Sequence, residues 1–471
     1  MHSSSARLGI MKTHIPAIIS LIVVVLASAV PAMGVRLPAL FSDGMVIQRD
    51  APIHVWGWGD EGERVTVRLG RNSASATAKD GKWSAVLQPM GAGGPFVLTV
   101  TGANRIEVND VLIGDVWVCS GQSNMQFELK NSFESQQDIA KAANPMIRLF
   151  TVPLVSARRA QDNVKSAWNL CSPESVDDFS AVGYYFGRDL QRALRTPIGL
   201  IDASWGGSPA EVWMRRSYAR IDPELDRINA LREGKGADGW RPGGAYNGMI
   251  APLVSFPIKG VIWYQGESNS RHPEDYGKLF PELIRNWRKD WGQGDFPFLL
   301  VQLAPYIAAE WPKDSWPVVR EVQLQATEGL PKVGMAVITD VGEERNIHPL
   351  HKEPVGARLA LAARAIAYGQ KLEYSGPIYK SMKTDGDKVV LSFTHVGKGL
   401  EARGGDLTGF EIAGEDGIFI LAVAAIKGKT VVVSSSQVAK PKAVRYGWTN
   451  CPIVNLFSKN GLPASPFRTS R

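Results

Sequence analysis

Short stretches of alternating apolar and polar residues occupy both ends of the chain. They recur roughly every ten residues over 35–112 and again over 373–460, with turn-forming pairs such as Asp80-Gly81 and Asp385-Gly386 between them. This period of two is typical of half-buried strands, and short strands at such spacing predict small β-sandwich domains. We therefore expect a β-sandwich domain at 35–112 and a β-rich domain at 373–471. The expected strands are 53–58, 64–69, 74–78, 82–87, 96–101, 389–393, 407–412, 418–423 and 430–434.

The middle of the chain, 113–372, has a different pattern, in which wholly apolar runs alternate with stretches of helical period. Apolar runs without alternation indicate strands buried on both faces, and their alternation with helices indicates a parallel sheet covered on both sides. The expected strands are 116–119, 147–152, 197–202, 258–264, 296–302 and 333–339; the expected helices are 181–194, 276–291, 318–329 and 354–368. The carboxyl ends of such strands meet at one edge, where α/β sites lie.

Residues 1–34 have the pattern of a secretory signal peptide. Arg7 and Lys12 precede an uncharged apolar run from Ile15 to Val30, and small residues follow it. A membrane anchor is the alternative, but the run is short for a bilayer span of about 20 residues. We expect cleavage, a secreted or periplasmic protein, and no stable membrane insertion afterwards.

Composition narrows the possible functions only slightly. Apolar residues make up 44% and charged residues 21%, which is typical of a folded protein. The net charge of +7 includes the two cations of the leader, and without a long basic run we expect no nucleic-acid partner. Three cysteines allow at most one disulfide, and some of the 14 tryptophans could form stacking platforms for sugars. The oligomeric state is not predictable from these features.

Polar loops that contain glycine follow three of the expected strands, at 120–124, 205–208 and 265–269, and a fourth loop after Thr339 holds 346–349. In the first loop, Ser120 and Ser123 lie where a buried strand turns into a helix. A serine at such a turn has an exposed hydroxyl beside helix N-terminal N–H groups, which suits a nucleophile whose attack creates an oxyanion. The alternative is that both serines are only turn or N-cap residues.

Among the seven histidines, His348 is the best candidate for a general base. Those in the leader and in the β domains are set aside, which leaves His272, His348 and His351. His348 precedes a proline in the fourth loop, whereas His351 is expected to be an exposed residue at a helix start. A metal pair formed by His348 and His351 is not expected, because no acidic or cysteine set at metal-ligand spacing lies beside them.

Glu267 is the preferred acid behind His348, since it ends a buried strand on the expected active edge, where an unpartnered charge is costly. It could instead form a structural ion pair or begin a helix. Asp340 and Glu343 are weaker candidates. Asn346 can hold an imidazole by a hydrogen bond but cannot stabilise imidazolium by charge.

The expected oxyanion donors are the backbone N–H of Ser123, an N–H of Gly206 or Gly207, and a side-chain amide of Gln265 or Asn269. Glycine has no Cβ and lets the backbone approach a ligand closely. Donors of this kind would form an acyl-transfer site that needs no cofactor.

With these residues in this order, the chain resembles the sialate O-acetylesterase family. That family is related to the acetylxylan esterases of carbohydrate esterase family six, within the SGNH hydrolases. The resemblance rests on Gly121-Gln-Ser-Asn-Met125, Ser204-Trp-Gly-Gly-Ser208, Trp263-Tyr-Gln-Gly-Glu-Ser-Asn269 and Ile347-His-Pro349. It implies a flavodoxin-like three-layer α/β/α hydrolase domain with flanking small β-sandwich domains, an O-acetylated carbohydrate substrate, and no metal.

The resemblance also assigns roles to residues. It implies Ser123, rather than Ser120, as the nucleophile and His348 as the base. Family members commonly have aspartate where this chain has Asn346, and the acetylxylan esterase relatives use the glutamate that corresponds to Glu267 as the triad acid. Two alternatives stay open: an esterase for acetylxylan or another polysaccharide, and a non-catalytic carbohydrate-binding protein, for which Asn346 is the only support.

Overall fold

The computed structural model describes residues 1–7, 9, 34–231, 240–307, 309 and 311–470. Contacts divide the chain into Met1–Met33 and Gly34–Arg471, and the architecture below concerns the second unit. The apolar run of the expected signal peptide lies outside the described residues. Within those residues, no helix has the length and apolar character needed to span a membrane.

A central sheet forms the middle of the second unit, as the alternation of apolar runs and helices predicts. In sheet order its strands are β13 (Val333–Ala336), β12 (Phe298–Val301), β11 (Gly260–Tyr264), β7 (Arg105–Gly121), β10 (Ile198–Ser204), β8 (Asn144–Thr151) and β9 (Asn169–Cys171). All neighbouring pairs are parallel except β8 with β9. Without β8 and β9, the five strands β7, β10, β11, β12 and β13 have the order 2-1-3-4-5 when numbered along the chain.

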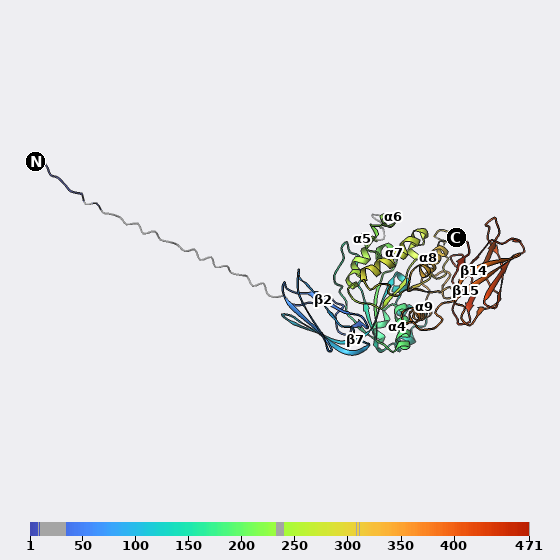
Figure 1. Cartoon of the computed structure of the whole chain (residues 1–471), viewed down its shortest axis with the longest axis horizontal. Helices are drawn as coiled ribbons and strands as arrows, with labels where there is room; N and C mark the ends of the chain where they lie inside the picture. The colour runs from blue at the N-terminus through green and yellow to red at the C-terminus, as the bar shows by residue number, and fades with distance from the viewer. Residues whose placement is uncertain (8, 10–33, 232–239, 308, 310, 471) are drawn as a thin grey trace. The chain divides into compact units, whose positions relative to one another are not determined.

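Helices lie against both faces of this sheet, and each face has its own core. Val118 belongs to one core and its neighbour Cys119 to the other, because successive side chains of a strand point to opposite faces. One core includes α7 (Pro273–Trp291) and α8 (Ser315–Gly329), and the other includes α4 (Ala181–Leu194) and α9 (Glu353–Ile366). Figure 1 shows these two helix pairs on opposite sides of the sheet. The four predicted helices are confirmed, with ends that differ from the prediction by no more than a few residues.

Shorter helical segments connect these elements. They are α1 (Ser123–Gln126), η1 (Leu129–Asn131), α2 (Gln136–Ala140), α3 (Pro173–Asp177), η2 (Ala210–Trp213), α5 (Arg216–Ala219), α6 (Pro223–Ala230), η3 (Tyr246–Ile250), η4 (Ala251–Leu253) and η5 (Glu267–Asn269). Three of them, α1, η2 and η5, follow directly on the carboxyl ends of β7, β10 and β11 or on the loops at those ends.

Strand β7 also belongs to the amino-terminal β region. Its first part pairs with β6, and its last part, from Asp115 to Gly121, pairs with β10 and β11. The other strands of this region are β1 (Val46–Gln48), β2 (Ile53–Trp58), β3 (Arg64–Leu69), β4 (Asn72–Thr77), β5 (Lys82–Leu87) and β6 (Gly93–Thr101). The five strands predicted here are confirmed. One continuous strand therefore crosses the expected domain boundary at 112/113, without a linker.

The carboxyl-terminal region is β-rich, as predicted. Its strands are β14 (Ile378–Asp385), β15 (Lys388–Thr394), β16 (Leu400–Ala402), β17 (Phe410–Ala413), β18 (Ile420–Leu421), β19 (Val423–Lys427), β20 (Thr430–Ser434), β21 (Ala443–Tyr446), β22 (Leu456–Ser458) and β23 (Phe467–Arg468). The single strand predicted at 418–423 is wrong. The chain divides there into β18, which pairs with β17, and β19, which pairs with β20 in another sheet.

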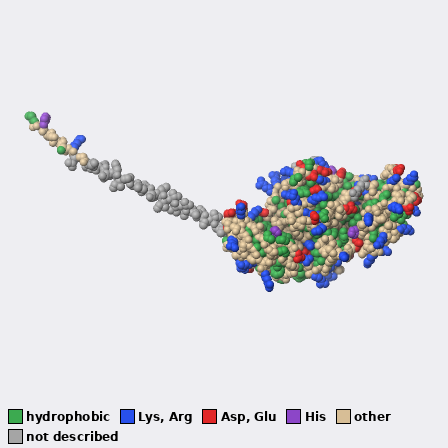
Figure 2. Space-filling view, in the orientation of Figure 1, with side chains coloured by type: hydrophobic (Ala, Val, Ile, Leu, Met, Phe, Trp, Pro, Cys, Tyr) green, Lys and Arg blue, Asp and Glu red, His purple; other side chains and the backbone are tan. Residues whose placement is uncertain are grey.

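Hydrogen bonds and an ion pair connect the carboxyl-terminal region to α8. The buried Arg320 guanidinium donates to the carbonyl oxygens of Thr449 and Asn450 at 2.8 Å each, and Glu321 pairs with Arg468 at 2.8 Å. On the molecular face in Figure 2, Lys and Arg side chains are interspersed with Asp and Glu side chains.

Candidate active site

Ser123 lies at the turn between β7 and α1. Gly121, the last residue of β7, has a φ of +134°, and a Cβ there would lie 2.1 Å from the Tyr264 carbonyl oxygen. Glycine is therefore required for the chain to turn so close to β11. The predicted strand, turn and helix are confirmed, although α1 has only four residues. The Ser123 side chain is half-buried and remains reachable.

The two serines of this turn have different surroundings. Ser120 is fully buried, and its hydroxyl donates to the Ala203 carbonyl oxygen at 2.6 Å. The Ser123 Oγ lies 2.8 Å from Nε2 of His348. The structure thus places Ser123, and not Ser120, beside a possible general base.

The loop that carries His348 is held through its backbone. Asn346 Oδ1 accepts from the His348 backbone N–H at 3.0 Å, and Asn346 Nδ2 donates to Glu343 at 3.1 Å. Glu343 also accepts from the Leu350 N–H at 2.6 Å. Asn346 therefore fixes the position of the loop, and its side chain does not hold the imidazole ring.

Glu267 begins η5 and is buried, as its place after β11 predicts, but its partner is not His348. Its Oε1 accepts from Asn124 Nδ2 at 2.6 Å, and its Oε2 is buried without a hydrogen bond to any described residue. Asn124 Nδ2 also donates to the Ile347 carbonyl oxygen at 2.9 Å. The predicted direct contact between the carboxylate and the imidazole is thus replaced by Asn124, which follows the serine and reaches the residue before His348.

A buried lysine completes this cluster. Lys352 Nζ donates to Asn124 Oδ1 at 2.5 Å, and its ammonium lies over the rings of Phe127 and Tyr264, 4.7 and 5.3 Å from their centroids. An ammonium must donate and a carboxylate must accept, so these two partners together define the orientation of the Asn124 amide. Asn124 therefore lies between a buried cation and a buried anion.

Burial dominates the electrostatics of these groups. It lowers the pKa of Lys352 to about 7 and raises the pKa of Glu267, because each charge is costly away from water. Burial, and then the positive charge of Lys352, lowers the pKa of His348. A lowered pKa keeps the imidazole neutral at neutral pH, which is the form that can accept a proton from Ser123.

The other acidic and histidine candidates do not contact Ser123 or His348 in the described structure. Asp340 forms a bidentate ion pair with Arg358, with both hydrogen bonds at 2.6 Å. His351 is exposed and packs on Phe133 at 4.2 Å between ring centroids, and His272 is exposed at the start of α7. Across the described ranges, no group of three or more His, Cys, Asp or Glu residues is arranged to hold a metal ion.

The expected oxyanion donors from the backbone are unequally available. The Ser123 N–H, at the start of α1, makes no hydrogen bond to a described residue. The Gly206 N–H donates to Gln126 Oε1 at 2.7 Å, and a Cβ on Gly206 would lie 3.4 Å from the Ser123 Cβ. Gly206 is thus adjacent to the serine but engaged, whereas the neighbouring Gly207 is exposed.

The two expected amide donors are engaged as well. Gln265 Nε2 donates to Asn269 Oδ1 at 2.7 Å and to the Ser208 carbonyl oxygen at 3.3 Å. Asn269 Oδ1 also accepts from the Ala210 N–H at 2.9 Å, and its Nδ2 donates to Glu211 at 2.9 Å. In this structure both amides join the loop after β10 to the loop after β11.

Asn124, Gln126 and Lys352 were not among the residues predicted for the site. Asn124 and Gln126 lie within four residues of Ser123, and their positions beside it were the available signal. Lys352 follows His348 by four residues, but nothing in the local sequence distinguishes it from an exposed lysine at a helix start.

Comparisons with known proteins agree on one family. A family model described as "Carbohydrate esterase, sialic acid-specific acetylesterase" matches residues 113–364. Sialate O-acetylesterases from Homo sapiens and Pongo abelii are each 32% identical, and the alignments cover 92% of this chain and 92% of each relative. The crystal structure of a carbohydrate acetylesterase from Xanthomonas citri is 41% identical, with a TM-score of 0.87, and covers 93% of this chain and 99% of that one.

Proposed function

Because the chain belongs to the carbohydrate esterase family of sialic acid-specific acetylesterases, we propose that it removes O-acetyl groups from sugars through an acetyl-enzyme formed on Ser123. The chain is a carbohydrate O-acetylesterase, a hydrolase of carboxylic esters. The observation that carries the mechanism is the 2.8 Å contact between Ser123 Oγ and His348 Nε2. This distance is within the reach that a nucleophile and its general base require.

In the proposed reaction, His348 Nε2 takes the proton of the Ser123 hydroxyl while Oγ attacks the acetyl carbonyl carbon. The carbonyl oxygen becomes an oxyanion, and we assign the N–H of Ser123, which makes no hydrogen bond to a described residue, as its donor. When the tetrahedral intermediate collapses, the bond to the sugar oxygen breaks and that oxygen leaves with the proton from His348. Water, activated by the same imidazole, then hydrolyses the acetyl-enzyme to acetate and restores Ser123.

We assign Glu267 a positioning role in this reaction. Its carboxylate holds the Asn124 amide, and Asn124 in turn holds the carbonyl of Ile347, next to His348. In this proposal Glu267 still orients the imidazole, but it does so indirectly, through Asn124 and Ile347. Gly206, Gln265 and Asn269 support the loops around the oxyanion, and Gly207 is the exposed position beside them.

The architecture around this site is part of the same proposal. The order 2-1-3-4-5 of the five strands and the helices on both faces support a flavodoxin-like three-layer domain of the SGNH type. The separate core of the carboxyl-terminal region supports a flanking domain there. The charge and apolar pattern of residues 1–34 supports export to the periplasm or the medium, which amino-terminal sequencing of the mature protein would test.

We propose a sialic acid as the sugar, since the animal relatives are sialate O-acetylesterases; acetylxylan is the alternative substrate. The test is acetate release from O-acetylated sialic acids, acetylated xylan and p-nitrophenyl acetate. Ser123→Ala is the blank, and Ser120→Ala, which removes the buried hydroxyl of the same turn, is the matched control. We expect the blank to be inactive and the control to keep most activity. Near-normal turnover by Ser123→Ala would contradict the mechanism. Faster acetate release from acetylated xylan than from O-acetylated sialic acids would identify xylan, and not sialate, as the substrate.

A further inference from the structure

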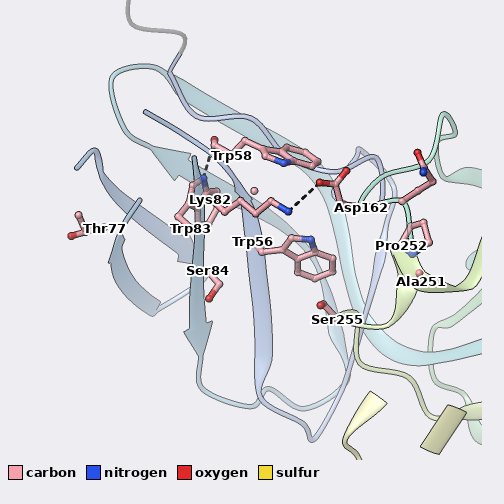
Figure 3. Close-up of a pocket in the computed structure, with 12 residues that line it drawn as sticks. Trp56, Trp58, Thr77, Lys82, Trp83, Ser84, Asp162, Ala251, Pro252 and Ser255 are labelled. Atoms are coloured by element: carbon pink, nitrogen blue, oxygen red, sulfur yellow. Dashed lines mark hydrogen bonds and ion pairs between the residues drawn. The ribbon is translucent and has the colours of Figure 1, made fainter. Parts of the chain in front are cut away.

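A second concave surface lies between the amino-terminal β region and the loops that precede β11. This tryptophan cleft has a volume of about 540 Å³. Figure 3 shows the Trp56 and Trp58 rings projecting into the same space, with Lys82 between them and Asp162, Pro252 and Ser255 opposite. No residue of the proposed esterase site lines it.

The two tryptophans share one face of β2, and that face is the less buried one. Along β2, the buried positions are Ile53, Val55 and Gly57, while Trp56 and Trp58 occupy the other face and stay partly exposed. Side chains at alternate positions of a strand share a face. In the paired strand β5, the residues opposite them are Ser84 and Lys82. The exposed face of a two-stranded antiparallel sheet is usually polar, so two indoles there need an explanation.

Packing within the protein accounts for only part of the tryptophan surface. The Trp56 ring packs against the buried rings of Phe41 and Phe256, at 4.8 and 6.4 Å between centroids, and the Arg36 guanidinium lies 5.7 Å from the centroid of Trp58. Both side chains nevertheless remain half-buried and line the cleft. Aromatic surface left open in this way is available to a ligand.

The polar groups of the cleft are well placed for hydroxyl-rich ligands. Lys82 Nζ pairs with Asp162 at 3.2 Å, and these side chains are 64% and 60% exposed. An ion pair so exposed adds little stability, and both groups keep donor and acceptor capacity for a ligand. The hydroxyl groups of Ser84 and Ser255 also lie on the lining. The Lys82–Asp162 pair has no net charge, so the cleft does not favour a strongly charged ligand.

We propose that the tryptophan cleft binds a neutral pyranose unit of a glycan, separately from the ester that is hydrolysed. The C–H face of a sugar ring is apolar and matches an indole face, while its hydroxyl groups match Lys82, Asp162 and the serines. Residues 251–255 precede the start of β11 at Gly260, whereas Glu267 and the proposed esterase site follow its carboxyl end. The cleft therefore holds part of a glycan chain without taking part in acyl transfer.

The test is binding of unacetylated cellohexaose, xylohexaose and mannohexaose to the full chain, measured by calorimetry and by saturation-transfer NMR. We expect at least one of them to bind, Trp58→Ala to weaken its binding about tenfold, and Trp58→Phe, which keeps a flat ring, to weaken it less. Lys82→Ala removes an exposed side chain and should weaken binding several-fold without unfolding the protein. Val97→Ala, on an exposed position of β6, is the matched control.

Two results would overturn the proposal: no binding of the three hexasaccharides at millimolar concentration, or equal binding by wild type, Trp58→Ala and Lys82→Ala. Its failure is distinguishable from failure of the esterase mechanism. The cleft variants should hydrolyse p-nitrophenyl acetate at the wild-type rate, and Ser123→Ala should bind the hexasaccharide as wild type does. A cleft variant that lost hydrolysis of this small ester would place the cleft in the esterase site and contradict a separate role.

Discussion

The half-buried pair Ser123–His348 and the buried cluster of Asn124, Glu267 and Lys352 are two layers of one site that differ in physical character. The pair is half-buried, joined by one 2.8 Å contact, and accessible to a substrate. The cluster has no more than 4% of any side chain exposed, and it contains both a potential cation and a potential anion. Asn124 connects the two layers by its hydrogen bond to the carbonyl of Ile347.

The difference shows how a hydrolase site can be organised when no carboxylate touches the imidazole in the described structure. A triad acid orients the ring and stabilises imidazolium directly. Here orientation comes through the backbone, from Asn346 and from Asn124, and the nearest identified charge effect on His348 is that of Lys352, which disfavours imidazolium. The outer layer is therefore expected to carry the chemistry and the inner layer to set its geometry and pH range.

The largest expected effect comes from replacing His348, the general base of the outer layer. We expect His348→Ala to lower kcat for p-nitrophenyl acetate by about 10²–10⁴-fold, because the general base is lost. His351→Ala removes an exposed imidazole three residues away and should leave kcat within about twofold, as is usual for surface changes. Steady-state kinetics of the two variants tests this. Equal losses in both would mean that the loop, and not the His348 imidazole, is what matters.

A smaller effect is expected from the inner layer. Glu267→Gln keeps an oxygen that can accept from Asn124 but removes the negative charge, and we expect kcat to fall by up to about 10²-fold through misplacement of His348. Asn346→Ala removes one hydrogen bond to the His348 N–H and should cost less. Kinetics should be measured together with melting temperature, so that unfolding is not mistaken for lost catalysis. A larger loss in Asn346→Ala would make the loop anchor the more important positioning group.

Much of the fold was predictable because its signals are local. The helix at 181–194 was predicted with its observed ends from the spacing of its apolar residues. In the structure Ser180 caps its first turn and Arg195 adopts the left-handed conformation that ends it. By contrast, only 116–119 of β7 was predicted as a strand. Its first residues alternate in exposure and those from Val111 onward are all buried, because one strand serves two sheets. Which strands pair across a sheet is a long-range property that periodicity does not contain.

The same limit applies to the site. The loops that form it were predictable from the sequence, whereas the partners of their side chains were not. Polar loops after buried strands predicted that residues 120–124, 265–269 and 346–349 would meet at one edge, and the contacts of Ser123, Asn124 and Glu267 lie there. The partner of Glu267 depends on side-chain reach and on the burial of Lys352, whose sequence neighbours are those of an ordinary helix start. A cation that is buried by tertiary packing leaves no local pattern.

The smallest expected effect is a shift in pH dependence that tests how the inner layer acts on the outer one. His348 must be neutral to accept a proton, so kcat/KM falls as the pH drops through its pKa, which burial and Lys352 hold below 6.5. The pKa of Lys352 is about 7, so this lysine is largely charged over that acid limb. Lys352→Met removes the charge, so the pKa of His348 rises and the midpoint of the acid limb should move to higher pH. Lys130→Met, at a partly exposed lysine, is the matched control and should leave the midpoint unchanged. An unchanged or lower midpoint in Lys352→Met would show that the buried lysine does not act on His348 through its charge.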